Sequence, residues 1–291
     1  MTRNYFKALG FILGVGTLVL FSCHGNNSNS IPPGTGSDST KSKNQVSAAD
    51  QDSETYLLPS PLQIASIFKN SGLVYLPDLT APIMDVSKYN SLYEQALNMG
   101  VYSADLSYCI LNKQTDDALK YLKIVKSLSD KLGFGSVFES NSFMKRFEAN
   151  MSSTDSLASL IADLQMETDT YLENNKQKYV GVIAFAGAWA ESMHVGAKVY
   201  DKNKTDGVSS RISEQMNILG NLMKLLDKYK AADSHIAGLV DQLKVVQTAF
   251  AGFDEVKNYN EDSDKPVSLT PDHIAQLSAL IEKVRSSFLA S

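Results

Sequence analysis

Apolar residues recur at alternating spacings of three and four along most of the chain after residue 60, which is the pattern of amphipathic helices. The clearest series are Ile236, Leu239, Leu243, Val246, Phe250 and Phe253, and then Ile274, Leu277, Ile281, Val284 and Phe288. No segment alternates with period two for long enough to predict a strand. The pattern predicts an all-α fold: a multi-helix bundle with long antiparallel helices in the C-terminal half and shorter helical hairpins in the N-terminal half.

Capping residues, prolines and glycines indicate where the helices begin and end. The first helix is expected to begin at Pro61, behind the capping residue Ser60, and to stop at Gly72, before a proline-containing connection. Gly100 is interpreted as a second stop. The other expected helices are 87–99, 102–112, 116–132, 140–150, 155–173 and 177–201, followed by three long ones with apolar seams over 212–226, 236–253 and 274–288.

The segment 180–200 is apolar on nearly all sides and rich in glycine and alanine. A helix that lacks a polar face is normally buried all round, and small residues let neighbouring helices approach its backbone. Glycine in a helix interior costs about 1 kcal/mol relative to alanine, so each such position needs a packing or functional reason. We therefore expect this segment to be the central helix of the fold.

The chain begins with two basic residues, Arg3 and Lys7, and an apolar run from Ala8 to Phe21. This run is shorter than the roughly 20 residues of a transmembrane helix and is typical of a secretion signal. The run ends in Leu20-Phe21-Ser22-Cys23, which resembles the lipobox of bacterial lipoproteins. That resemblance implies that 1–22 is a signal peptide and that Cys23 carries a covalent lipid. Because His24 follows instead of aspartate, the resemblance also implies the outer membrane of the cell envelope.

Residues 24–54 are dominated by Gly, Asn, Ser, Thr and Asp, with very few large apolar side chains. Such a segment buries too little surface to offset its chain entropy. We therefore expect the lipidated cysteine and a disordered tether over 23–54, and one helical domain over 55–291.

The formal net charge is −5, and no cluster of basic residues occurs. Nucleic acids and anionic lipid surfaces are bound through clustered Lys and Arg, so the composition argues against nucleic acid as a partner and against an electrostatic membrane patch. The expected attachment to the membrane is therefore the lipid on Cys23. The second cysteine, Cys109, lies in an apolar stretch and is expected to be a small buried side chain.

A weaker resemblance covers 103–133. The residues that carry it are Ala104, Tyr108, the turn at Lys113 to Thr115, the run Asp117 to Leu122, and Leu132-Gly133. They are similar to one tetratricopeptide hairpin, although Lys113 stands where the turn glycine is expected and no second copy follows 34 residues later. The resemblance implies a helical hairpin at this point.

Glu191 and His194 are the one pair with the spacing of metal ligands, since residues three apart share a helix face. Glu-x-x-His occurs in di-iron helical bundles, but there two copies and two further glutamates meet. The alternatives are a hydrogen-bonded structural pair, a metal or haem site, and a site for another polar ligand. The type of metal stays unknown at this stage.

No other catalytic template is present: the sequence has no nucleophile elbow, no phosphate-binding loop and no paired-cysteine motif. The acidic segment 258–265 is interpreted as a polar loop, since it lacks the glycine and terminal glutamate of a calcium loop. We expect a binding or scaffolding lipoprotein that is not an enzyme, uses no cofactor and contacts an envelope protein through the connection 73–84 or through helix faces. The alternative is a small-ligand or metal-binding lipoprotein centred on Glu191 and His194. A third alternative is an enzyme of unfamiliar type, because catalytic residues on different helices leave no local spacing.

Overall fold

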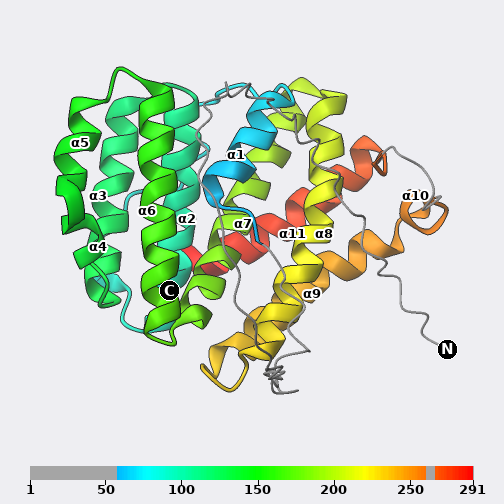
Figure 1. Ribbon diagram of the computed structural model, residues 1–291. Helices are drawn as coiled ribbons and strands as arrows, with labels where there is room; N and C mark the ends of the chain where they lie inside the picture. Colours follow the sequence, from blue (N-terminus) through cyan, green and yellow to red (C-terminus); the bar gives the residue numbers. More distant parts are fainter. Residues whose placement is uncertain (1–57, 260–265, 291) are drawn as a thin grey trace, which may run out of the picture. The chain divides into compact units, whose positions relative to one another are not determined.

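The computed structural model describes residues 58–259 and 266–290, and in these ranges every regular element is helical (Figure 1). The all-α fold and the multi-helix bundle are thereby confirmed. The signal peptide, Cys23, the tether and most of the acidic segment 258–265 lie outside the described residues. The elements are α1 (Pro61–Asn70), η1 (Val86–Lys88), α2 (Leu92–Leu111), α3 (Thr115–Lys131), α4 (Ser136–Glu139), η2 (Ser140–Ser142), α5 (Phe143–Ala149), α6 (Thr154–Asn174), α7 (Lys178–Asn203), α8 (Asp206–Lys228), α9 (His235–Gly252), α10 (Asp254–Lys257) and α11 (Pro271–Leu289).

Local capping chemistry sets the first turn of several helices. In α1 the Ser60 hydroxyl accepts from the backbone N–H of Gln63 at 3.2 Å, and the Gln63 side chain accepts from the Ser60 N–H at 2.7 Å. This reciprocal pair satisfies two of the backbone donors that a helix start leaves free. Thr270 caps α11 in the same position before Pro271. Not every helix start has such a cap: α3 begins at Thr115, and Gln114 before it makes no capping side-chain bond.

The helix α7 is the centre of the fold, as its composition predicts. Its residues from Val182 to Ala197 are all buried, and the helix contacts α1, α2, α6, α8 and α11 (Figure 1). Although α7 is so apolar, neither it nor any other helix in the described ranges combines the length and hydropathy that crossing a bilayer requires. Its apolar surface is covered by protein.

The seams of the C-terminal helices point into the same core. The seam residues named above over 236–253 and 274–288 are buried except Phe250, which is half-buried. The seam of α8 is buried as well, at Ile212, Met216, Leu219, Met223 and Leu226. Cys109 on α2 is also buried, as expected, and burial raises the pKa of its thiol to about 12. A thiol in that state is not a nucleophile at neutral pH.

The two expected helices 87–99 and 102–112 are wrong, because α2 runs without a break through Gly100. A Cβ atom on Gly100 would lie 1.7 Å from the carbonyl oxygen of Ala184, and one on Gly187 would lie 2.0 Å from that of Leu97. The backbones of α2 and α7 therefore touch at reciprocal glycines, and this is the most extensive contact between two described helices. Gly100 marks a helix crossing and not a helix end.

This contact predicts that Gly100→Ala and Gly187→Ala destabilise the domain, although alanine is the better helix former. Separating two backbones in a packed core costs about 1–3 kcal/mol or more, which exceeds the roughly 1 kcal/mol that alanine contributes in a helix interior. Urea unfolding followed by circular dichroism measures the change in the free energy of unfolding.

Gly238 in α9 is the matched control, since a Cβ atom there meets nothing within 4 Å. Gly238→Ala is expected to leave stability unchanged or raise it by up to about 1 kcal/mol. Equal stability of Gly100→Ala, Gly187→Ala and the wild type would contradict the backbone contact.

Candidate functional site

A group of charged side chains meets in the core where α2, α7 and α11 approach one another. Glu191 on α7 is fully buried and accepts two hydrogen bonds from the guanidinium of Arg285 on α11. Nε of Arg285 lies 2.5 Å from Oε2, and Nη2 lies 3.0 Å from Oε1. This bidentate geometry is the strongest form of a carboxylate–guanidinium pair and ties α7 to α11.

Asp105 on α2 adds a second buried carboxyl to this pair. Its Oδ2 accepts from the backbone N–H of Ala81 at 2.9 Å, and its side chain lies within hydrogen-bonding reach of Glu191. Burial, followed by the charge of Glu191, raises the pKa of Asp105 well above its ordinary value, against the effects of the Ala81 amide and Arg285. Burial also raises the pKa of Glu191, while the hydrogen bonds and charge of Arg285 oppose that rise.

His194, one turn after Glu191, has a different partner on α11. Its Nδ1 lies 2.7 Å from Oε2 of Glu282, and Nζ of Lys198 lies 3.7 Å from the same oxygen. Burial and the nearby Arg285 lower the pKa of His194 to about 4. The imidazole is therefore neutral near pH 7. Its Nδ1 lies close to the Glu282 carboxylate, but the two groups are not aligned for a hydrogen bond.

The predicted pair thus lies on one face of α7, but its two members serve different partners. Glu191 binds Arg285 and lies beside Asp105, whereas His194 lies beside Glu282. Within the part of the chain that the structure describes, no three His, Cys, Asp or Glu side chains are placed to hold a metal ion. No hydrogen bond between Glu191 and His194 is present among the described residues, so the structure does not show the hydrogen-bonded pair of the first alternative. It shows separate contacts of the two side chains with other helices.

Of the residues that complete this cluster, Asp105 carries a local sequence signal and Arg285 does not. Asp105 is the one acidic residue in the buried stretch 96–110, and such an isolated charge points to a buried pair, because buried charges are normally paired. Arg285 follows the seam residue Val284, but Glu282 and Lys283 lie close to it in the sequence, so its charge is not isolated. Their partners lie far away in the chain, and no spacing rule connects them.

Above the cluster, the connection from α1 to η1 runs without regular structure over residues 73–85, which we call the strap. Its backbone is held by polar side chains of α2, α3 and α11 and not by a helix or sheet ladder. The Tyr108 hydroxyl accepts from the Leu76 N–H at 2.7 Å and donates to the Leu76 carbonyl at 3.2 Å. The Tyr102 hydroxyl accepts from the Met84 N–H at 3.3 Å and donates to the Pro82 carbonyl at 3.1 Å. Tyr121 donates to the Ala81 carbonyl at 3.0 Å, and Arg285 Nη2 donates to the Leu79 carbonyl at 3.5 Å. Asp105 supplies the bond to Ala81 already described.

The outer side of the strap carries apolar side chains. Val74 is 45% exposed and Ile83 is 50% exposed, while Tyr75, Leu76 and Met84 are half-buried. These residues fall in the connection 73–84 that the sequence singles out as a contact region. A fixed backbone with exposed apolar side chains is suited to contact with another protein.

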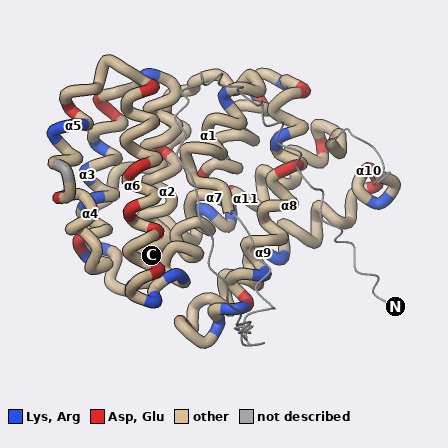
Figure 2. Tube along the Cα trace, viewed as in Figure 1, with Lys and Arg blue, Asp and Glu red and all other residues tan. Residues whose placement is uncertain are grey.

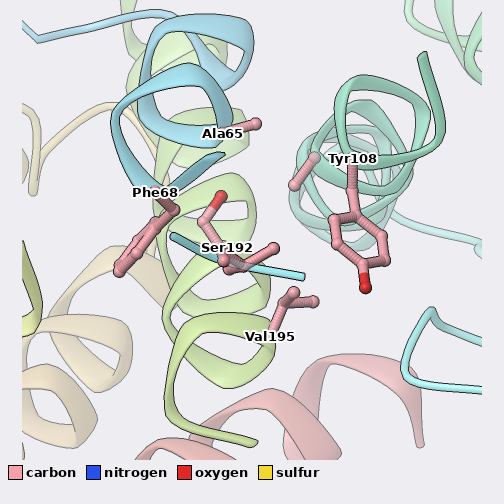
Figure 3. A pocket seen from close by; sticks show the side chains of 7 residues that line it. Ala65, Phe68, Tyr108, Ser192 and Val195 are labelled. Carbon is pink, nitrogen blue, oxygen red and sulfur yellow. The ribbon is translucent and has the colours of Figure 1, made fainter. Parts of the chain in front are cut away.

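The cavity next to the strap is too small for a ligand. It lies between α1, α2 and α7, has a volume of about 20 Å³ and holds about one water molecule. Figure 3 shows Phe68 of α1, Tyr108 of α2, and Ser192 and Val195 of α7 around it. Figure 2 shows that basic and acidic positions are both spread along the described helices.

Comparison with known proteins adds no relative: no family model matches the chain, and neither a curated protein nor a solved structure is significantly similar to it. The arguments about function therefore depend on the residues themselves.

The buried pair leads to a prediction on stability. Arg285→Met leaves Glu191 charged and unpaired in the core, and removing one partner of such a pair costs about 3–5 kcal/mol. The double variant Glu191→Gln and Arg285→Met removes both charges and is expected to recover most of that loss. Urea unfolding of the three proteins measures these differences in the free energy of unfolding.

The exposed pair of Lys120 and Asp117, 2.7 Å apart, is the control. Lys120→Met is expected to change stability by less than about 1 kcal/mol, because water screens an exposed pair. Equal losses in Lys120→Met and Arg285→Met would contradict the role given to the buried pair.

Proposed function

We propose that the protein is a lipid-anchored lipoprotein of the bacterial cell envelope whose helical domain binds or scaffolds an envelope protein. The observation that carries the proposal is Leu20-Phe21-Ser22-Cys23 behind a basic start and a short apolar run. Each buried methylene of an acyl chain contributes about 0.8 kcal/mol, so the two or three chains of a lipoprotein give lasting attachment.

The polar segment after Cys23 is the proposed tether. A flexible chain of about 30 residues has a root-mean-square reach of roughly 30 Å, which places the helical domain clear of the lipid headgroups. The domain then meets partners that lie on or near the same membrane, which we place by the lipobox resemblance at the outer membrane.

The strap is the proposed contact surface. Val74 and Ile83 are exposed on a backbone that five side chains below it hold in one conformation. A surface that is already ordered loses less conformational entropy on binding than a flexible loop does. The proposed partner is an envelope protein with an apolar surface that receives these two side chains.

Lipidation is tested by labelling cells with radioactive palmitate and by fractionating their membranes. The wild type is expected to take up the label and to sediment with outer membranes, and Cys23→Ala is expected to lose both properties. Cys109→Ala is the matched control, because it removes the other cysteine and should keep both. A Cys23→Ala protein that still carries the label would overturn the anchor.

The contact surface is tested with a photo-crosslinking amino acid placed at Ile83 in intact cells. We expect one discrete adduct, which becomes weaker when Val74→Glu adds a charge to the same strap. The control is the same amino acid at Met166 on α6, which is 63% exposed and also apolar. The same adducts from both positions, or none from Ile83, would rule out the strap as the contact.

A further inference from the structure

The buried cluster contains one acid more than its bases can balance. The exposed fractions of Asp105, Glu191 and Arg285 are 1%, 0% and 8%. If both carboxyls were ionised, one guanidinium would face two negative charges in a region that excludes water. Two carboxyls that share a site do not both ionise easily, because repulsion and burial favour a proton on one of them.

One atom of the cluster lacks a partner while both carboxyls are ionised. Oδ1 of Asp105 is buried and has no hydrogen-bond donor near it. An ionised carboxylate only accepts hydrogen bonds, so two ionised carboxylates cannot bond to each other. Buried polar atoms in folded proteins normally have partners, and a proton on Oδ1 would give this atom one.

We propose that Asp105 is a neutral carboxylic acid in the folded protein, that it donates its proton to Glu191, and that this hydrogen bond joins the strap to the ion pair of α7 and α11. Asp105 holds the proton because Glu191 receives both hydrogen bonds of the guanidinium, which favour its charged form. The cluster is then neutral as a whole, with Glu191 negative and Arg285 positive.

The proton connects two parts of the molecule. On one side Asp105 Oδ2 accepts from Ala81 in the strap, and on the other side Oδ1–H reaches Glu191. Loss of the proton would place a second negative charge below the strap. This part of the inference bears on the proposed contact surface, but the protonation state itself is independent of any partner.

Several titratable and charged groups face Asp105 from the surrounding helices. From α2 and α3 it is faced by Tyr102, Tyr108, Tyr121 and Cys109, whose pKa values burial raises, and from α7 and α11 by Glu191 and Arg285. The strap contributes backbone groups, Ala81 N–H to Asp105 and Leu79 C=O to Arg285. His194, Lys198 and Glu282 form the next group outward on α7 and α11.

The sign of the pH effect follows from linkage. Asp105 keeps its proton in the folded state and loses it near pH 3.9 when unfolded, so its contribution to stability falls as pH rises, until the folded pKa is reached. The folded pKa of His194 is lowered to about 4, and its unfolded pKa is about 6.5. Its contribution to stability therefore rises with pH between these two values and is constant above them. Cys109 adds a loss only above its unfolded pKa of about 8.5. Between about pH 6.5 and 8 neither His194 nor Cys109 contributes, and the slope reports the proton of the coupled carboxyls Asp105 and Glu191.

The first test is infrared spectroscopy of the full chain in nonionic detergent at pH 7. Protonated carboxyls have a C=O band that ionised carboxylates lack. We expect such a band, we expect it to shift when only aspartate carries ¹³C, and we expect it to be missing in Asp105→Asn. Absence of the band, or a shift with labelled glutamate instead, would overturn the assignment. The labelled wild type alone decides whether an aspartate or a glutamate holds the proton, even if the variant does not fold.

The second test is urea unfolding between pH 6.5 and 8. For the wild type the unfolding equilibrium constant is expected to rise up to about tenfold per pH unit. Asn at position 105 keeps a donor for Glu191 and an acceptor for Ala81 but does not titrate, so Asp105→Asn is expected to show almost no slope. Asp117→Asn, on the exposed face of α3, should keep the wild-type slope. Equal slopes in all three proteins would overturn the proposal, whatever the crosslinking experiment on the strap gives.

Discussion

The interaction on which the fold depends is the buried pair of Glu191 and Arg285. Glu191 lies in the middle of the central helix and is fully buried, on a helix whose buried residues are mostly apolar. A charge in such a place requires an opposite charge with matching hydrogen bonds. Arg285 meets that requirement only if α11 lies against α7 in one register. The pair therefore fixes the position of α11 along α7.

The contact of α2 with α7 depends on glycine. Gly100 and Gly187 let the two backbones touch, and one turn or slightly more beyond each glycine the chain carries an acid, Asp105 on α2 and Glu191 on α7. Side chains at these positions meet because the helices are so close. With larger residues at the crossing, the two carboxyls would lie apart and each would need a partner of its own. The small residues thus make a shared buried cluster feasible.

The fold class and most of the core could be predicted from the sequence, because the seams of α8, α9 and α11 and the apolar composition of α7 are local patterns. The split of α2 at Gly100 was wrong, since a glycine that ends a helix and one that admits a second backbone look alike in a single sequence. The pair Glu191 and His194 was recognised by spacing, but its meaning depends on Asp105, Glu282 and Arg285. Their proximity follows from tertiary packing, which spacing along one helix does not encode.

The strap explains why the core holds charges at all. An apolar cluster of the same volume would often stabilise a helix pair as well as an ion pair does. It would not satisfy the peptide groups of a segment that passes over the core without a helix or sheet of its own. Asp105, Arg285 and the tyrosines of α2 and α3 supply those partners. The buried polar groups are therefore best understood as the support of the strap, and a change that removes them should alter the strap before it alters the helices.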